Sequence, residues 1–277
     1  MTDRQEVARH YSQGNLLERL RLALETTGKS AAGVSVDDLA PADEFHIGGR
    51  TASEEFISQL GLTVQHRVLD VGCGIGGTSR FVADRYGCRV CGVDVTPEFI
   101  ETGRVLCDWV GLGERVDLQH GSALDLPFDD GSFDAAIMLH VGMNIADKQA
   151  LFAEVCRILR PGALFGVYDV MQTGAGPITY PVPWSSAPGT SALTTPEDYS
   201  AALEQAGFTL LARRDRRDFA LEFFTEARRR MEASGSAPVL GVHIAMGDNA
   251  PLKIANMIGN ITAGLIAPVE IIARRSM

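Results

Sequence analysis

Ten residues constrain the fold of this chain more than any other segment: Val68-Leu69-Asp70-Val71-Gly72-Cys73-Gly74-Ile75-Gly76-Gly77. The apolar residues around Asp70 predict a buried β-strand, and the glycines predict a sharp turn that enters a helix at about Thr78. Because glycine has no Cβ, backbone N–H groups of such a turn, with the N-terminus of the helix, can approach a nucleotide-like ligand closely. The segment therefore predicts a nucleoside-binding site at the end of a strand.

The glycines alone fit two different motifs. Gly72, Gly74 and Gly77 satisfy the G-x-G-x-x-G pattern of dinucleotide-binding proteins. The D-x-G-x-G-x-G pattern of S-adenosylmethionine (SAM) enzymes is satisfied equally well, by Asp70, Gly72, Gly74 and Gly76. Asp94, at the end of the next predicted strand, suits both, since a carboxylate there can accept hydrogen bonds from ribose hydroxyls.

Strands and helices alternate regularly beyond residue 66. The predicted strands are Arg67–Val71, Arg89–Asp94, Arg115–His120, Asp134–Leu139 and Leu164–Val170. Helices are predicted between them at about 78–86, from Thr96-Pro97 onward, and at about 148–160, where Pro161-Gly162 ends the last one. This alternation indicates an α/β fold with a parallel, doubly wound sheet.

The flanking regions follow a different pattern. Helical spacing at residues 3–27 is interrupted at Gly14, and a turn-rich connector, Gly28 to Asp43, precedes a short helix at Thr51–Gly61. Beyond Met171, a loop rich in Gly, Pro and Ser predicts a lid, followed by further helices and two strands, Phe208–Leu211 and Pro268–Ala273. We therefore expect an N-terminal helical cap at 1–60, a ligand-binding core at 61–170, and a lid insertion with the C-terminal strands of the same domain at 171–277.

Composition limits the partners. The formal net charge of −10 disfavours binding to a nucleic-acid backbone, and the arginine clusters at 213–217 and 228–230 are interleaved with acids, as on solvated surfaces. No apolar stretch is long enough to span a bilayer and no signal-peptide core follows Met1, so we expect a soluble, cytoplasmic protein without a membrane partner. Cys88-x-x-Cys91 has no matching second pair, so no metal site is expected, and a homo-oligomer is left open.

Three features favour SAM over a nicotinamide dinucleotide. The carboxylate of Asp70 can interact with the methionyl ammonium of SAM, a group that NAD lacks. Residues 121–128 follow the third strand, where an adenine needs an edge contact and an apolar wall. The third feature is the segment 133–140, which leads to the turn at 160–164. An NAD(P)-dependent oxidoreductase would also need a catalytic pair such as Tyr-x-x-x-Lys, which the sequence lacks. A non-catalytic SAM-binding protein is the remaining alternative.

The order of motifs across residues 66–170 resembles the class I SAM-dependent methyltransferases. Residues 43–50 and 140–148 are similar to the bacterial small-molecule branch, which includes sarcosine/dimethylglycine-type N-methyltransferases and natural-product O- and C-methyltransferases. The resemblance implies a Rossmann-like, seven-stranded sheet of order 3-2-1-4-5-7-6 whose last strand is antiparallel, with N-terminal helices and a helical lid. It also implies transfer of a methyl group from SAM to a small-molecule acceptor, an amine or a natural-product hydroxyl or carbon, with S-adenosylhomocysteine (SAH) as product.

The same resemblance implies a set of cofactor contacts. The methionine and ribose pocket would be lined by Asp70, Gly72, Gly74 and Gly76, and the ribose hydroxyls would be bound by Asp94 beside Val95 and Thr96. The adenine would be flanked by Ser122 and Ala123, with Ser122 standing where the family commonly has Asp, and the methyl group would lie near Leu139 and His140.

Two histidines are candidate catalytic bases. A hydroxyl acceptor would gain from a near-neutral imidazole at His140 or His46, whereas an amine or an activated carbon can react without one. The candidate wall of the acceptor pocket consists of Tyr11, His46, Met143, Tyr180 and Trp184.

Overall fold

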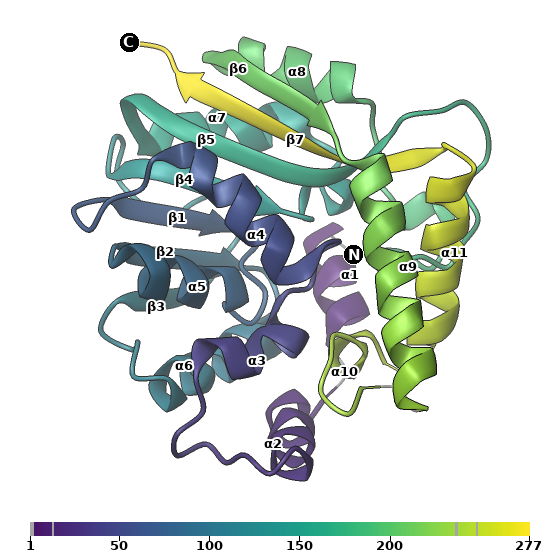
Figure 1. The fold of residues 1–277 in the computed structure, drawn as a ribbon. Coiled ribbons are helices and arrows are strands. Elements are labelled where there is room, and N and C mark those ends of the chain that lie inside the picture. Colours follow the sequence, from purple (N-terminus) through teal and green to yellow (C-terminus); the bar gives the residue numbers. More distant parts are fainter. Residues whose placement is uncertain (1–2, 13, 236–237, 248) are drawn as a thin grey trace.

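The computed structural model describes residues 3–12, 14–235, 238–247 and 249–277. At its centre lies a seven-stranded sheet of order β3-β2-β1-β4-β5-β7-β6 (Figure 1). β7 runs antiparallel to both of its neighbours, β5 and β6, and all the other pairs are parallel. The predicted strand order and the antiparallel strand are thus confirmed. The strands are β1 (Arg67–Val71), β2 (Arg89–Asp94), β3 (Val116–His120), β4 (Phe133–Leu139), β5 (Leu159–Gln172), β6 (Phe208–Asp215) and β7 (Ile266–Arg275).

Helices cover both faces of this sheet. Because side chains alternate along a strand, Leu69 of β1 packs on one face with α7 (Lys148–Ile158) and α8 (Pro196–Gln205). Its neighbour Val68 packs on the other face with α4 (Gly49–Ile57), α5 (Gly77–Tyr86) and α6 (Pro97–Trp109). Such two-sided burial explains why the central strands are apolar along their whole length.

The N-terminal region corrects one prediction. The expected break at Gly14 separates α1 (Asp3–Tyr11) from α2 (Leu16–Thr26), but the second half of the expected connector is helical, as α3 (Val36–Asp43). Ser35 begins this helix with a capping box, because its hydroxyl accepts the Asp38 N–H while the Asp38 carboxylate accepts the Ser35 N–H. That Ser-x-x-Asp signature outweighs Pro41, the residue that suggested a turn.

The C-terminal region supplies the helices that stand beside the sheet. The chain leaves β6 into α9 (Arg217–Ser234), passes through the short α10 (His243–Met246) and α11 (Ala250–Thr262), and returns as β7. In Figure 1, α9 and α11 stand side by side at one end of the sheet, with α1 next to them. Three single-turn segments complete the fold: η1 (Ser58–Leu60), η2 (Gly142–Asn144) and η3 (Pro188–Thr190).

Two further expectations differ from the structure. β5 already begins at Leu159, so Pro161-Gly162 lies within the strand rather than ending the preceding helix. Arg216 is not on a solvated face: it is 5% exposed, and its guanidinium pairs with Glu55 of α4 and Glu270 of β7 at 2.6 and 2.9 Å. The ion pairs compensate its burial where β6 turns into α9. No described helix is long and apolar enough to cross a membrane.

Candidate active site

A cavity of about 250 Å³ opens at the carboxyl ends of the parallel strands. It lies where the chain order reverses between β1 and β4, the point at which open α/β sheets bind their ligands. Its walls come from the turn after β1, the ends of β2 and β4, the loop after β3 and the helix α1. The strand order therefore places the predicted glycine turn and both predicted aspartates around one space.

The glycine turn requires glycine for two separate reasons. Gly72, Gly74 and Gly76 all have positive φ, at 71°, 55° and 79°. A Cβ on Gly72 would overlap Val141, whereas a Cβ on Gly74 would meet nothing within 4 Å. Gly72 and Gly74 line the cavity as expected, but Gly76 does not. Gly76 instead lets the turn pass Leu118, which a Cβ there would approach to 2.7 Å.

Asp94 braces this turn from the end of β2. Its Oδ2 accepts the Gly74 N–H at 2.9 Å, and its Oδ1 accepts the Thr96 N–H at 2.8 Å. Each carboxylate oxygen keeps a further lone pair that can accept a ribose hydroxyl. Val95 and Thr96 line the cavity beside Asp94, as predicted.

Asp70 lies deeper, at the floor of the cavity. Its side chain is buried and its Oδ2 accepts a 2.6 Å hydrogen bond from Ser79. Burial, with a smaller contribution from the nearby carboxylates of Asp94 and Glu44, raises the pKa of Asp70 to about 7. A bound cation would favour the ionised form, so this position suits an ammonium group.

The loop after β3 forms the remaining wall. Ser122 and Ala123 line the cavity, and the Ser122 hydroxyl accepts the Leu124 N–H at 3.2 Å. Phe99 of α6, which the sequence analysis did not single out, adds a buried aromatic face. An acid at the floor, a second acid at the rim and an apolar wall match the ammonium, ribose and adenine of SAM, so the residues present fit this cofactor.

His140 follows β4 and turns back over the sheet. Its φ of 55° is unusual for a residue with a side chain, and its backbone N–H donates to the Tyr168 carbonyl at 2.8 Å. The imidazole Nε2 is buried and has no hydrogen-bond partner among the described residues. Burial, with the neighbouring His46, lowers the pKa of His140 well below 6.5. The ring is therefore neutral at pH 7 and able to take up a proton.

His46 lies beside His140, with the two ring centroids 6.0 Å apart. Its Nε2 lies 3.0 Å from Ser53 Oγ, 3.2 Å from the Gly49 carbonyl and 3.4 Å from Glu44 Oε2. Burial lowers the pKa of His46 to about 4. The structure thus brings the two predicted bases together, but it ties His46 to the start of α4 and leaves His140 open.

A second cavity, of about 660 Å³, lies on the other side of these histidines, which line both cavities. The linings of both cavities include Tyr11, Phe45, His46 and His140. Met143 and Trp184 line the second cavity, as predicted, but Tyr180 lines neither and packs into the apolar cluster beneath. The other lining residues come mainly from the segment 37–54, and the rest include residues of α9, α10 and α11, for which the sequence analysis named no site residue.

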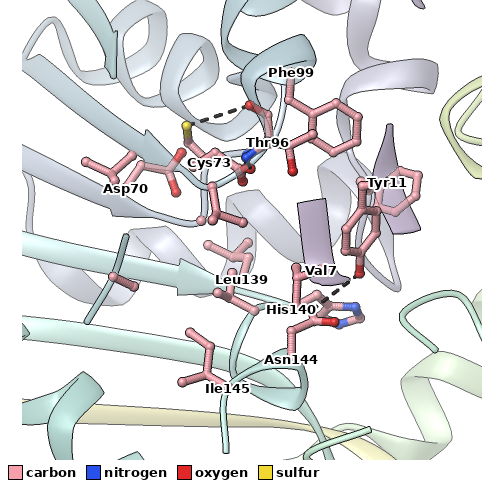
Figure 2. Close-up of a pocket in the computed structure, with 18 of the residues that line it drawn as sticks. Val7, Tyr11, Asp70, Cys73, Thr96, Phe99, Leu139, His140, Asn144 and Ile145 are labelled. Carbon is pink, nitrogen blue, oxygen red and sulfur yellow. Dashed lines mark hydrogen bonds between the residues drawn. The ribbon is translucent and has the colours of Figure 1, made fainter. Parts of the chain in front are cut away.

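Helix α1 covers one side of the first cavity, where Val7 and Tyr11 belong to its lining. Figure 2 shows Tyr11 and His140 on the same side of the cavity, opposite Asp70, with a dashed line from Tyr11 to Asn144. This is a 3.3 Å hydrogen bond from the Asn144 amide to the tyrosine hydroxyl. Asn144 belongs to the segment 140–148 that supports the family resemblance, so that signal could have included it among the site residues.

Comparisons with known proteins agree with this geometry. A family model described as a methyltransferase domain matches residues 68–162. Methyltransferase GfsG of Streptomyces halstedii is 30% identical over 213 residues, which are 74% of this chain and 73% of that protein. The probable chloroplastic tocopherol O-methyltransferase of Oryza sativa subsp. japonica is 42% identical over 96 residues, 35% of this chain but only 26% of the rice protein.

Solved structures share the fold over the whole length. The geranyl diphosphate C-methyltransferase of Streptomyces coelicolor A3(2), crystallised with Mg²⁺, geranyl diphosphate and SAH, superposes with a TM-score of 0.69. The sequences are 21% identical, and the match covers 99% of this chain and 98% of the other. The match therefore includes the helices around the second cavity as well as the central sheet.

Proposed function

This chain belongs to the SAM-dependent methyltransferases, and we propose that it methylates a small-molecule acceptor held in the larger of the two cavities that are lined by His46 and His140. The sequence-based prediction of a methyltransferase, rather than an NAD(P)-dependent oxidoreductase, is confirmed. The observation that carries the proposal is the junction: the linings of both cavities include the same pair of neutral imidazoles, His46 and His140. SAM, when bound, supplies an electrophilic methyl group and leaves as SAH.

The cofactor contacts follow from the cavity walls. Asp70 would meet the ammonium group, Asp94 would accept the ribose hydroxyls, and Ser122 with Ala123 would flank the adenine. Gly72 and Gly74 have no side chain that would obstruct the methionyl part of the cofactor. Leu139 and His140, which line the same cavity, would border the methyl group.

The protein's contribution to the reaction is orientation and proton transfer. Holding the two reactants in line can lower the barrier by roughly 7–11 kcal/mol. Val7 and Tyr11 of α1 cover the cavity and keep water from the reacting atoms. His140 accepts the proton that a hydroxyl acceptor loses, and His46, held by Ser53 and Glu44, fixes the position of the His140 ring.

Calorimetry on the wild type and an Asp94→Ala variant tests the cofactor site. The variant loses two charge-assisted hydrogen bonds, each worth about 1.5–3 kcal/mol, so SAM should bind about 100-fold more weakly. Asp117→Ala is the matched control, because Asp117 is exposed on the neighbouring strand β3. Unchanged affinity in the Asp94 variant, or tight binding of NAD(P) in place of SAM, contradicts the proposal.

A further inference from the structure

We propose that the acceptor is an uncharged, mostly apolar molecule, larger than an amino acid, that reacts through a hydroxyl group at His140. The inference rests on the proposed function, because it uses the same junction between the two cavities. It selects among the acceptor classes that the sequence left open: a hydroxyl-bearing compound rather than a sarcosine-like amine.

The size of the second cavity is the first argument. Its volume of about 660 Å³ falls within the roughly 300–1,000 Å³ that is typical of sites for drug-sized ligands. Sarcosine, which consists of little more than a methylamino group and a carboxylate, would leave most of this space to water. A molecule that fills the cavity also displaces water from the junction.

The walls are the second argument. Outside the segment 37–54, they are mainly aromatic, aliphatic and thioether side chains, from the loop after β5, from α9, from residues 242–246 and from α11: Pro183, Trp184, Phe223, Phe224, Val242, Met246, Ile254 and Met257. The indole N–H of Trp184 already donates to Ser191 Oγ at 3.0 Å, so the ring offers the cavity only its apolar surface. Flexible methionines adapt to irregular apolar shapes. These walls favour an acceptor with an extended hydrocarbon body.

The distribution of charge is the third argument. Of the two arginines that line the described part of the cavity, Arg230 is exposed at its rim. The charge of Arg50 is balanced by Glu44, because its Nε lies 3.0 Å from Glu44 Oε1, although its two terminal guanidinium nitrogens have no hydrogen-bond partner among the described residues. A diphosphate, which carries more than one charge, would find no second buried cation among the described lining residues. Charged acceptors are therefore disfavoured, since an unpaired buried charge is costly.

A cationic amine is disfavoured for the same reason. Among the described residues of the lining, Glu44 is the one buried carboxylate, and it is paired with Arg50 and accepts a 2.8 Å hydrogen bond from Ser53. The other two acids in this described lining, Asp37 and Glu54, are exposed. An amine that is protonated at pH 7 would thus lie beside two neutral imidazoles with no buried counter-charge.

The unpartnered Nε2 of His140 identifies the reacting group. A buried nitrogen without a hydrogen bond is unfavourable, and in the tautomer that leaves Nε2 unprotonated the methyl acceptor should bring a hydrogen-bond donor to it. A hydroxyl meets this need in the ground state and loses its proton along the same bond. The hydroxyl oxygen gains the methyl group, its proton passes to the imidazole and SAH is released, so atoms and charge balance.

Binding measurements on the SAH-loaded protein test the class directly. The neutral dye N-phenyl-1-naphthylamine should bind with enhanced fluorescence, and 4-alkylphenols should displace it with affinities that rise about three- to four-fold per methylene. Ile254→Glu, which places a carboxylate in the cavity wall, should weaken dye binding at least ten-fold. Leu252→Glu on the same helix is the control, because Leu252 is 53% exposed. SAH calorimetry on every variant verifies folding.

The hydroxyl is tested by comparing each phenol with its methyl ether. The phenol should bind about five-fold more tightly in the wild type, the value of one ordinary hydrogen bond, and this preference should vanish in His140→Ala. The inference is overturned if sarcosine or geranyl diphosphate binds more tightly than the alkylphenols. It is also overturned if the Ile254→Glu variant binds the dye with wild-type affinity. Neither outcome contradicts the proposed methyltransferase function. If SAH itself fails to bind, the proposed function falls with it.

Discussion

The two cavities that meet at His140 are built in different ways. The walls of the cofactor cavity come largely from backbone and short side chains at the ends of adjacent strands, so the sheet itself fixes their positions. The acceptor cavity is enclosed by side chains from α3, α4, the loop after β5 and α9–α11, which are far apart in the sequence. Its shape can therefore change through helix side chains without disturbing the cofactor contacts.

Their electrostatics differ as well. Of the carboxyl groups that line the cofactor cavity, Asp70 and Asp94 form no ion pair with a described residue, and burial raises the pKa values of both. The buried charges around the acceptor cavity are already paired within the protein, as Glu44 with Arg50. The difference suggests that one cavity is completed by a cationic ligand and the other by an uncharged one.

The largest effect is expected where the cavities join. His140→Ala should lower kcat by about 10²- to 10⁴-fold, the usual contribution of a general base, while SAM affinity stays within about three-fold of wild type. Because burial lowers the pKa of His140 well below 6.5, wild-type kcat should be constant from pH 7 to 8 and fall only under acidic conditions. Steady-state kinetics and a pH profile measure both effects. Wild-type turnover in the variant would remove the catalytic role, and His66→Ala, at the opposite end of β1, is the control.

A smaller effect is expected on the stability of the protein, through the buried carboxyl group of Asp70 in the cofactor cavity. The folded pKa of Asp70, about 7, lies above its unfolded value, so the folded state holds the proton between about pH 4 and 7. Stability without ligand therefore falls as pH rises through this range. Asp70→Asn should raise the melting temperature of the SAM-free protein at pH 8 by several degrees and far less at pH 5. The same variant should weaken SAM binding about ten-fold, because the ammonium loses its ionised partner.

Thermal melts at the two pH values measure the change in melting temperature, and calorimetry measures the change in SAM affinity. Asp117→Asn, a substitution of an exposed carboxylate, should change neither property. An equal shift at both pH values would mean that Asp70 is not protonated in the free protein, and the contrast in charge between the cavities would be lost.

The two cavities also differ in how far the sequence predicts them. The cofactor cavity depends on local patterns: a strand that ends at an acid, glycines with positive φ, and a second acid at the end of the next strand. Each of these features is visible within a few residues, and the strand order then brings Asp70, Asp94 and Ser122 together. Gly76 was expected among the cofactor contacts but does not line the cavity, and a repeating motif does not show which of its glycines faces the ligand.

The acceptor cavity depends on packing between distant segments, which no local pattern records. Tyr180 and Trp184 lie in the same loop and were both expected in the wall, yet only Trp184 lines the cavity. The direction of a side chain in an irregular loop is decided by its tertiary contacts. Phe223 and Met257 were missed for a related reason, since an apolar face on a helix predicts burial without indicating whether a core or a cavity lies beneath it.

The smallest predicted effect concerns Ser122, the expected contact of the adenine in the cofactor cavity. Ser122 stands where the family resemblance leads us to expect Asp, and its hydroxyl is partly occupied by the Leu124 N–H. Ser122→Asp should strengthen SAM binding about five-fold, because a charged acceptor exceeds a neutral one by about 1 kcal/mol in hydrogen bonding to the adenine amino group. Calorimetry should show this gain with SAM and lose most of it with an analogue whose adenine lacks the amino group. Equal gains with both ligands would place the adenine away from Ser122, and the loop after β3 would then contribute only packing to the site.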